Sequence, residues 1–122
     1  MWDRDTLQEK RRIQIRIPVS LLPPQVQQQH ADKKELPMPY LNELEWDRGT
    51  LLANLWYQDV LLRVDVESGL IIRNYDFSTL FPRAIRPKTT DCFNGIALTD
   101  TENEFFVTGK WWPNLYRIRL ID

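Results

Sequence analysis

Short apolar runs broken by turn residues are the sequence feature that most constrains the fold of this chain. Residues 13–17 read Ile-Gln-Ile-Arg-Ile, and Pro18 follows them. Alternation of this kind places the three isoleucines on one face of a β-strand, and a proline ends the hydrogen-bonded ladder. Runs with helical periodicity extend no further than about two turns anywhere in the sequence. The pattern therefore predicts an all-β fold.

The remaining strands follow from the same pattern. A long Pro- and Gln-rich loop is expected over residues 18–40, because its prolines disfavour both helix and sheet. After it the sequence predicts seven strands, over residues 43–47, 50–56, 60–65, 70–76, 93–99, 104–108 and 114–120. Arg48-Gly49 and Ser68-Gly69 supply turns between neighbouring strands. Residues 77–83 are predicted to form a helical turn that ends at Pro82.

Length, charge and cysteine content exclude several classes of function. The 122 residues suit one compact domain, and a net charge of -1 gives no basic field for a nucleic acid partner. The uncharged stretches are shorter than the ~20 apolar residues of a membrane-spanning helix. Three of the first five residues are charged and no apolar run follows them, so no secretory signal is expected here. Cys92 and His30 each stand alone, so we expect no disulfide, no metal site and no cofactor.

The last two thirds of the chain contain a weak internal repeat. Residues 42–46 correspond to 94–98, residues 53–56 to 108–111, and residues 62–65 to 116–119, at offsets of 52, 55 and 54 residues. A four-stranded unit of this period is typical of a β-propeller blade. We therefore predict a partial β-propeller in which residues 1–17 end one blade, 41–76 form a full blade and 92–122 form three strands of a last blade.

Several motifs together resemble one family. Residues 41–46 (LNELEW), 53–56 (ANLW) and 106–113 (FVTGKWWP) are similar to the C-terminal half of the plant and bacterial type of glutaminyl-peptide cyclotransferase. The resemblance implies about half of a five-bladed β-propeller. It also implies a transferase that converts the N-terminal glutamine of a peptide or protein into pyroglutamate and releases ammonia.

The resemblance implies roles for three residues. Asn42 matches the family's substrate-binding asparagine, whose amide would donate to the reacting carbonyl oxygen, and Lys110 matches the active-site lysine. Trp56 matches a tryptophan that lines the substrate pocket. The residues alone leave other interpretations open: Asn42 can begin a strand, Lys110 can be solvated, and Trp56 can pack between sheets.

The family's catalytic glutamate falls outside the matched half, so we do not assign Glu43 and Glu45 as an acid and base pair. We expect the chain alone to be inactive. An alternative is a propeller fragment without activity, or a protein-binding module whose open blade edges pair with the missing N-terminal propeller half or with another chain.

Overall fold

The computed structural model of the chain describes residues 1–121, which form an all-β fold as predicted. Nine strands lie in two sheets, with one short helix and two 3-10 turns. The strands are β1 (Arg16–Pro18), β2 (Glu35–Pro37), β3 (Leu41–Asp47), β4 (Thr50–Leu55), β5 (Val60–Asp65), β6 (Leu70–Asp76), β7 (Phe93–Leu98), β8 (Glu104–Gly109) and β9 (Tyr116–Arg119). The helix α1 spans Pro24–Gln29, and the 3-10 turns span Val19–Leu21 and Arg83–Ile85. In this part of the chain no helix has the length and apolar character needed to cross a membrane.

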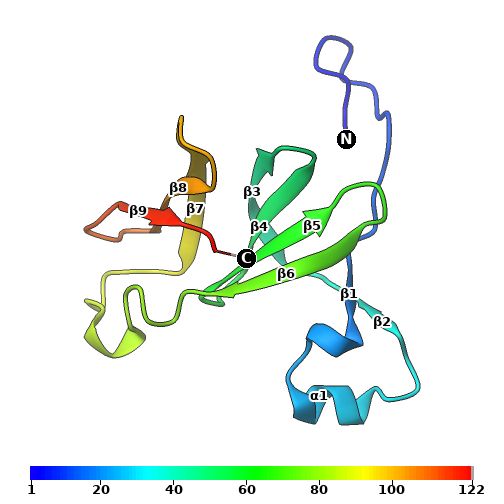
Figure 1. The fold of residues 1–122 in the computed structure, drawn as a ribbon. Coiled ribbons are helices and arrows are strands. Elements are labelled where there is room, and N and C mark those ends of the chain that lie inside the picture. The colour runs from blue at the N-terminus through cyan, green and yellow to red at the C-terminus, as the bar shows by residue number, and fades with distance from the viewer. Residues whose placement is uncertain (122) are drawn as a thin grey trace.

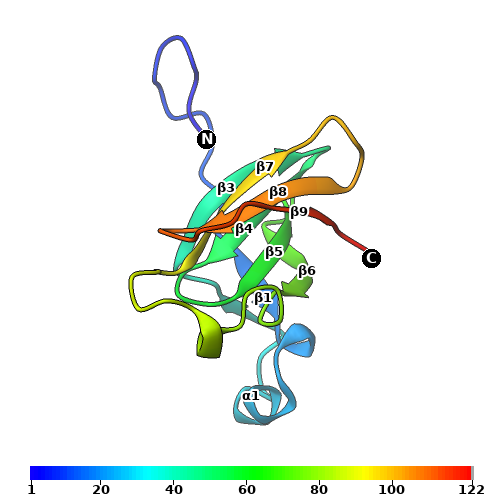
Figure 2. The same ribbon diagram turned by 90° about the vertical axis from the view of Figure 1, so that its left-hand side faces the viewer.

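The strands are arranged as expected for propeller blades. β3 to β6 form an antiparallel meander, and β7, β8 and β9 form a separate antiparallel sheet beside it (Figure 1). β1 joins the outer edge of the meander by parallel pairing of Arg16 with Leu70, and β2 pairs with β1. The segment before β1 extends away from the sheets as an arm (Figures 1 and 2).

The main core lies between the two sheets. Leu52 of β4 and Leu61 of β5 are fully buried against Phe93, Phe105 and Val107 of the smaller sheet, with other members of the same cluster at Phe81, Ile96, Trp112 and Leu120. In β8 the buried residues Phe105 and Val107 alternate with Phe106, which is 36% exposed. This alternation assigns one face of each sheet to the core.

A second apolar cluster covers the opposite face of the meander. Leu62, Val64 and Ile71 are buried there together with Ile17 of β1. Leu36 of β2 packs against the same cluster. The N-terminal strands therefore cover the outer part of this face.

A buried ion pair ties the first turn of the meander to its third strand. Nη1 of Arg63 donates to Oδ2 of Asp47 at 2.7 Å and to Oγ1 of Thr50 at 2.7 Å. Asp47 and Arg63 are 4% and 8% exposed. Burial alone would raise the pKa of Asp47, but hydrogen bonds from Arg63 and Arg48 outweigh it and hold that pKa below its ordinary value of 3.8.

The structure corrects two of the expectations for the N-terminal segment. Regular strand pairing begins only at Arg16, because residues 13–15 have no neighbouring strand apart from the bond that Met38 N donates to Ile15 O. The expected loop over residues 18–40 contains a 3-10 turn, α1 and β2. Pro24 begins α1, where its missing N–H costs nothing and its fixed φ suits a first turn. The assignment of residues 1–17 to a preceding blade stays a prediction.

The predicted helical turn over residues 77–83 is also displaced. The 3-10 turn begins after Pro82 rather than ending at it, and spans Arg83–Ile85. The reason is the same as in α1: proline is accommodated just before or at the first helical position.

Replacement of Asp47 by asparagine tests the buried ion pair. A carboxyl whose folded pKa is lowered stabilises the fold above its unfolded pKa, and that contribution is lost as the pH falls through the folded pKa. We expect Asp47→Asn to lower the free energy of unfolding by about 3 kcal/mol at pH 7, because the Arg63 charge loses its partner. We also expect the variant to lose less stability than the native chain below pH ~4. Urea unfolding followed by circular dichroism at several pH values measures both effects, with exposed Asp32→Asn as the control. An unchanged pH dependence in Asp47→Asn would contradict the assignment.

Replacement of Gly109 by alanine tests the packing of Trp112 on the end of β8. A methyl group at Gly109 would lie 2.2 Å from Cε2 of the Trp112 ring. Since the ring must move, we expect a loss of about 1–3 kcal/mol in unfolding free energy. At Gly95 the nearest atom is a side-chain methyl of Thr108 at 3.0 Å, so Gly95→Ala is the milder control. Equal thermal stability of the two variants would show that Trp112 does not constrain this position.

Candidate functional site

The first strands of the two sheets, β3 and β7, each contain a β-bulge at the same place, and we call them the inner strands. In β3 the pairing with β4 shifts between Leu41 and Leu44, and in β7 the pairing with β8 shifts between Phe93 and Ile96. In each case two residues of the inner strand lie opposite a single residue of its partner. Asn42 is one of the two in β3. The predicted site residue therefore lies in a backbone irregularity rather than in a regular ladder.

Hydrogen bonds between the sheets hold both bulges. The backbone N–H of Glu43 donates to Oδ1 of Asn94 at 3.1 Å, and the N–H of Gly95 donates to Oδ1 of Asn54 at 3.1 Å. Asn54 is fully buried, and its Nδ2 has no partner among residues 1–121. A bulge leaves backbone groups outside the ladder, and here side-chain amides of the facing strands satisfy two of them. The bulges thus fix the position of one inner strand relative to the other.

Matching turns follow β4 and β8 and carry the other two predicted residues. Gln58 N donates to Leu55 O at 3.0 Å, and Trp112 N donates to Gly109 O at 3.2 Å. Trp56 and Lys110 each occupy the second position of their turn.

The residues after them, Tyr57 and Trp111, have φ values of 57° and 60°. Trp56 is therefore equivalent to Lys110, and the offset in this region is 54 residues rather than the 55 expected from the sequence. The expected correspondence of Trp56 with Trp111 is wrong by one position, because the side-chain pattern alone does not fix the register of a turn.

The three predicted residues lie at the same end of the two sheets. Trp56 N donates to Tyr40 O at 2.8 Å beside the start of β3, and Lys110 N donates to Cys92 O at 2.9 Å beside the start of β7. Asn42 is half-buried, whereas Trp56 is 46% exposed and Lys110 is exposed. Within residues 1–121 the side chains of Asn42 and Lys110 make no hydrogen bond or ion pair. Both polar groups are therefore available to a ligand.

Two tyrosines that the sequence analysis did not single out flank Trp56. Its ring centroid lies 4.8 Å from that of Tyr57 and 6.3 Å from that of Tyr40. These tyrosines are 51% and 68% exposed, and both have a positive φ. Non-glycine residues with positive φ are uncommon and often mark functional turns. The sequence signal for this aromatic cluster was the Trp56-Tyr57 pair at a strand end.

A buried cation supports the turn that carries Lys110. The Arg86 guanidinium lies 4.5 Å from the centroid of the Trp112 ring, and its Nη2 lies 2.9 Å from Oδ1 of Asp59. The indole N–H of Trp112 donates to Asp91 O at 2.9 Å. The N–H of Asp91 in turn donates to Lys110 O at 2.8 Å. This chain of contacts fixes the backbone at Lys110 and leaves its side chain in solvent.

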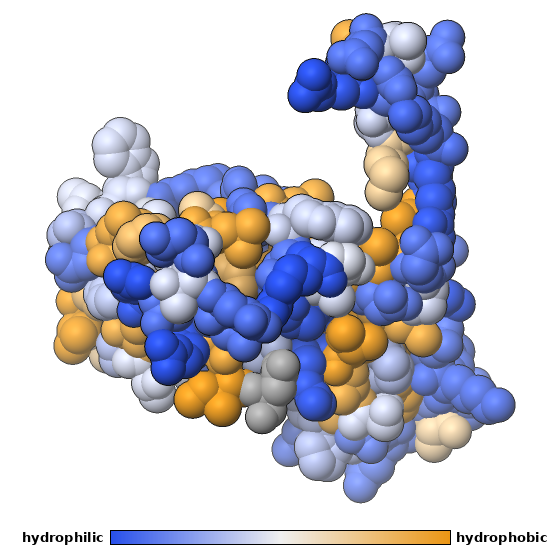
Figure 3. All heavy atoms as spheres, turned by 45° about the horizontal axis from the view of Figure 1, so that its top comes forward, coloured by the Kyte–Doolittle hydropathy of each residue, from blue (hydrophilic) through white to orange (hydrophobic). Residues whose placement is uncertain are grey.

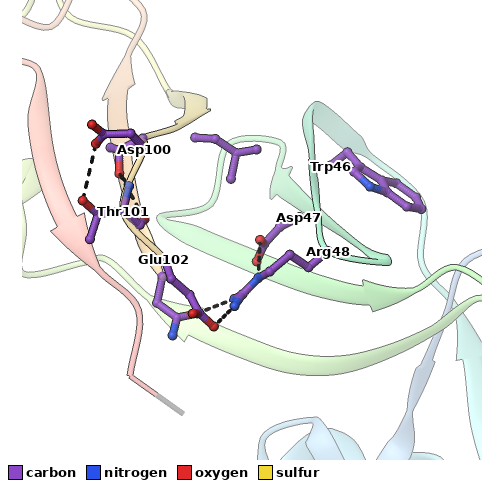
Figure 4. A pocket seen from close by; sticks show the side chains of 9 residues that line it. Trp46, Asp47, Arg48, Asp100, Thr101 and Glu102 are labelled. Atoms are coloured by element: carbon purple, nitrogen blue, oxygen red, sulfur yellow. Dashed lines mark hydrogen bonds and ion pairs between the residues drawn. The ribbon is translucent and has the colours of Figure 1, made fainter.

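The opposite end of the inner strands forms a separate hollow. A space of about 330 Å³ lies between the β3–β4 and β7–β8 turns, lined by Trp46, Asp47, Arg48 and residues 98–103 (Figure 4). Arg48 spans it with bonds to Glu102 and, at 2.6 Å, to Oδ1 of Asn103. None of the three predicted site residues lines this hollow. Its polar groups are largely paired with one another, and the bonds of Arg48 across it join the two sheets.

The end of the two sheets that carries Asn42, Lys110 and Trp56 thus combines a neutral donor, a cation and an aromatic surface. The amide of Asn42 and the ammonium of Lys110 suit an oxygen that gains negative charge, and Trp56 suits a compact organic group. Among the described residues no three or more His, Cys, Asp or Glu side chains form a group that could hold a metal. Glu43 approaches the neighbouring sheet through its backbone N–H, and its side chain is exposed.

Comparison with known proteins agrees with the family resemblance seen in the sequence. The family model described as glutamine cyclotransferase matches residues 2–120. A relative from Arabidopsis thaliana, named glutaminyl-peptide cyclotransferase, is 36% identical over 83 residues, which cover 66% of this chain and 26% of the relative. The matched part is therefore about a quarter of that relative's length. Because the family model matches nearly the whole chain, this chain belongs to the glutamine cyclotransferase family.

Proposed function

We propose that this chain forms part of a glutaminyl-peptide cyclotransferase and supplies the groups that bind and polarise the substrate. The observation that supports the proposal is the presence, at one end of two adjoining sheets, of an asparagine amide and a lysine ammonium without intramolecular partners. The family membership and the name of the Arabidopsis relative point to the same reaction.

The reaction closes a ring within the substrate. The neutral α-amine of an N-terminal glutamine attacks the carbon of its own side-chain amide, and a new C–N bond forms. The carbonyl oxygen becomes an anion in the tetrahedral intermediate, and a proton moves from the attacking nitrogen to the amide nitrogen. The old C–N bond then breaks, ammonia leaves, and the carbonyl of the five-membered lactam is restored.

Asn42 and Lys110 are proposed to stabilise the developing oxyanion. A preorganised donor at such an oxygen contributes about 3 kcal/mol to transition-state stabilisation. Asn42 lies in a bulge that is held by the neighbouring sheet, and the backbone of Lys110 is bonded to Cys92 and Asp91, the two residues before β7. Fixed backbones of this kind reduce the reorganisation that the donors need during the reaction.

Trp56 is proposed to form one wall of the substrate pocket. Ring closure requires the glutamine side chain to fold back on its own amine, and a flat apolar surface favours that compact conformation. Tyr40 and Tyr57 extend the aromatic surface on both sides of Trp56. The peptide chain beyond the first residue would lie over these rings.

The proton transfer requires a further group. The resemblance to the family implies that a glutamate outside the matched half of the propeller acts as the acid and base. The side chains that we propose for the site, Asn42, Lys110 and Trp56, include no carboxylate. We therefore propose that turnover needs an additional part of the propeller.

Ammonia release from the dipeptide Gln-Phe tests the function. The chain is assayed alone and after co-expression with the part of the Arabidopsis relative outside the matched segment. We expect no turnover by the chain alone and measurable kcat/KM in the complex. In the complex, Lys110→Ala should lower kcat about 100-fold, because the variant lacks the positive charge that stabilises the oxyanion in the transition state.

Lys33→Ala removes an exposed lysine that is not among the proposed site residues and serves as the matched control. Activity equal to the native complex in Lys110→Ala would remove Lys110 from the site without removing the function. A folded complex without turnover would instead favour the non-enzymatic alternative, a propeller-type binding module. That alternative draws on the exposed apolar side chains Leu44 and Trp46, which are 48% and 50% exposed.

A further inference from the structure

The two turns that carry Trp56 and Lys110 are joined by charged side chains. We call residues 55–58 the Trp56 turn and residues 109–112 the Lys110 turn. Each turn is closed by a backbone hydrogen bond between its first and last residues. Because the turns belong to different sheets, no strand ladder fixes one relative to the other.

Asp59 is the carboxylate at the centre of this connection. It follows the Trp56 turn directly and is 8% exposed. Nε of Arg83 donates to Oδ2 of Asp59 at 2.9 Å, and Nη2 of Arg86 donates to Oδ1 at 2.9 Å. Hydrogen bonds between charged groups are stronger than neutral ones, and a carboxylate has enough lone pairs to accept both.

Both arginines come from the segment that connects the two sheets. The 3-10 turn in this segment spans Arg83–Ile85, and Arg86 follows it directly. In such a turn the side chains of residues three apart lie on the same side, so both guanidinium groups reach one carboxylate. Nε of Arg86 also donates to Phe81 O at 2.7 Å, which holds that guanidinium in place.

Each arginine also holds one of the two turns. Nη2 of Arg83 donates to Tyr57 O at 2.6 Å, in the Trp56 turn. The guanidinium of Arg86 lies 4.5 Å from the ring centroid of Trp112, the last residue of the other turn. A cation over an indole face is a favourable contact, and it is stronger here because the Arg86 side chain is only 8% exposed. The carboxylate therefore links the two turns through the two arginines.

This connection is not part of the repeated blade. The two turns are equivalent at an offset of 54 residues, and the residue equivalent to Asp59 is Pro113. The smaller sheet therefore builds the same turn without a carboxylate at this position. All the contacts of the connection lie within residues 57–112, so they are complete within the chain.

The other hollows and connections of the molecule lie elsewhere. Figure 3 shows apolar residues in the recess between the arm and the body of the molecule, and the groove of about 420 Å³ there contains no residue of either turn. The bonds of Arg48 to Glu102 and Asn103 join the sheets at their opposite end. Asp59 thus does at the site end what Arg48 does at the opposite end.

We propose that Asp59 is a positioning residue that sets the spacing between the Trp56 wall and the Lys110 ammonium. This inference rests on the proposed function, in which Trp56 binds the substrate and Lys110 stabilises the oxyanion. Asp59 is buried and both its oxygens are paired, so it acts through Arg83 and Arg86 and not by contact with the substrate. Ring closure needs accurate placement of the reacting groups, and a misplacement of about 1 Å can cost on the order of 100-fold in rate.

Steady-state kinetics on Gln-Phe, with the complex that contains the remaining part of the Arabidopsis relative, separates the two halves of the connection. Arg83→Gln loosens the Trp56 turn and should raise KM about fivefold with little change in kcat, because the pocket wall binds substrate and transition state alike. Arg86→Gln loosens the Lys110 turn and should lower kcat about 10-fold with little change in KM, because the cation acts on the oxyanion. Asp59→Asn breaks both halves and should change both constants.

Arg48→Gln is the matched control. Arg48 bridges the same two sheets, and its side chain is 50% exposed, close to the 61% of Arg83. We expect Arg48→Gln to leave kcat and KM within about twofold of the native values. Equal effects of Arg48→Gln and Arg86→Gln on kcat would show a merely structural role and overturn the proposal. Circular dichroism verifies folding, and if Asp59→Asn does not fold, the split between Arg83→Gln and Arg86→Gln decides.

Hydrogen exchange of the chain measures the connection without turnover. Asp59→Asn should raise the exchange rates of the Gln58 and Trp112 amides about fivefold, because both turns lose their common anchor. Arg48→Gln should leave both rates unchanged. Faster exchange in only one turn, or in neither, would overturn the proposal. A native complex without turnover would instead contradict the proposed function, and the exchange rates would still decide whether Asp59 joins the two turns.

Discussion

The packing of one sheet face on another is the constraint on which the rest of the structure depends. A four-stranded antiparallel sheet with apolar residues on both faces cannot leave both faces in water. Here the β3–β6 meander buries Leu52 and Leu61 against the smaller sheet and Leu62 and Val64 under the N-terminal strands. The inner strands of both sheets are brought together as a result, and their ends form the candidate site.

The bulges turn this packing into a defined geometry. Apolar contacts are tolerant of small shifts, whereas the hydrogen bonds from Glu43 N to Asn94 and from Gly95 N to Asn54 allow only one register. The contacts of Arg86 with Asp59 and with Trp112 likewise fix the turn that carries Lys110. Side chains for binding are thus presented from turns and bulges, while the regular strands supply the rigid frame.

The sequence predicted the regular part of the fold well and the irregular part less well. Period-two alternation located β3 to β9 within one or two residues, because burial of one face forces that pattern. It failed over residues 13–40, where proline at a first helical position allowed α1 and where β2 is defined by a partner rather than by its own pattern. It also misaligned Trp56 by one residue, because the side-chain pattern does not fix the register of the turn that follows β4.

Prediction of the site depended on a different kind of information. Nothing in alternation distinguishes Asn42 from Asn94, which lie in equivalent bulges, and only the family resemblance selected Asn42, Trp56 and Lys110. Tyr40 was missed because its proximity to Trp56 arises from a backbone bond between separate segments, and Tyr57 was missed although it follows Trp56 directly in the sequence.

The parallel pairing of β1 with β6 has a consequence for the order in which the chain folds. Arg16 meets Leu70 across more than fifty intervening residues, whereas each neighbouring pair within the meander is joined by a tight turn. Closing the long loop costs more chain entropy than closing a hairpin. The meander can therefore form first and act as a template, and β1 and β2 attach to a finished edge. Their amide protons would exchange with solvent sooner than those of β4 and β5, because they can detach without opening the core between the sheets.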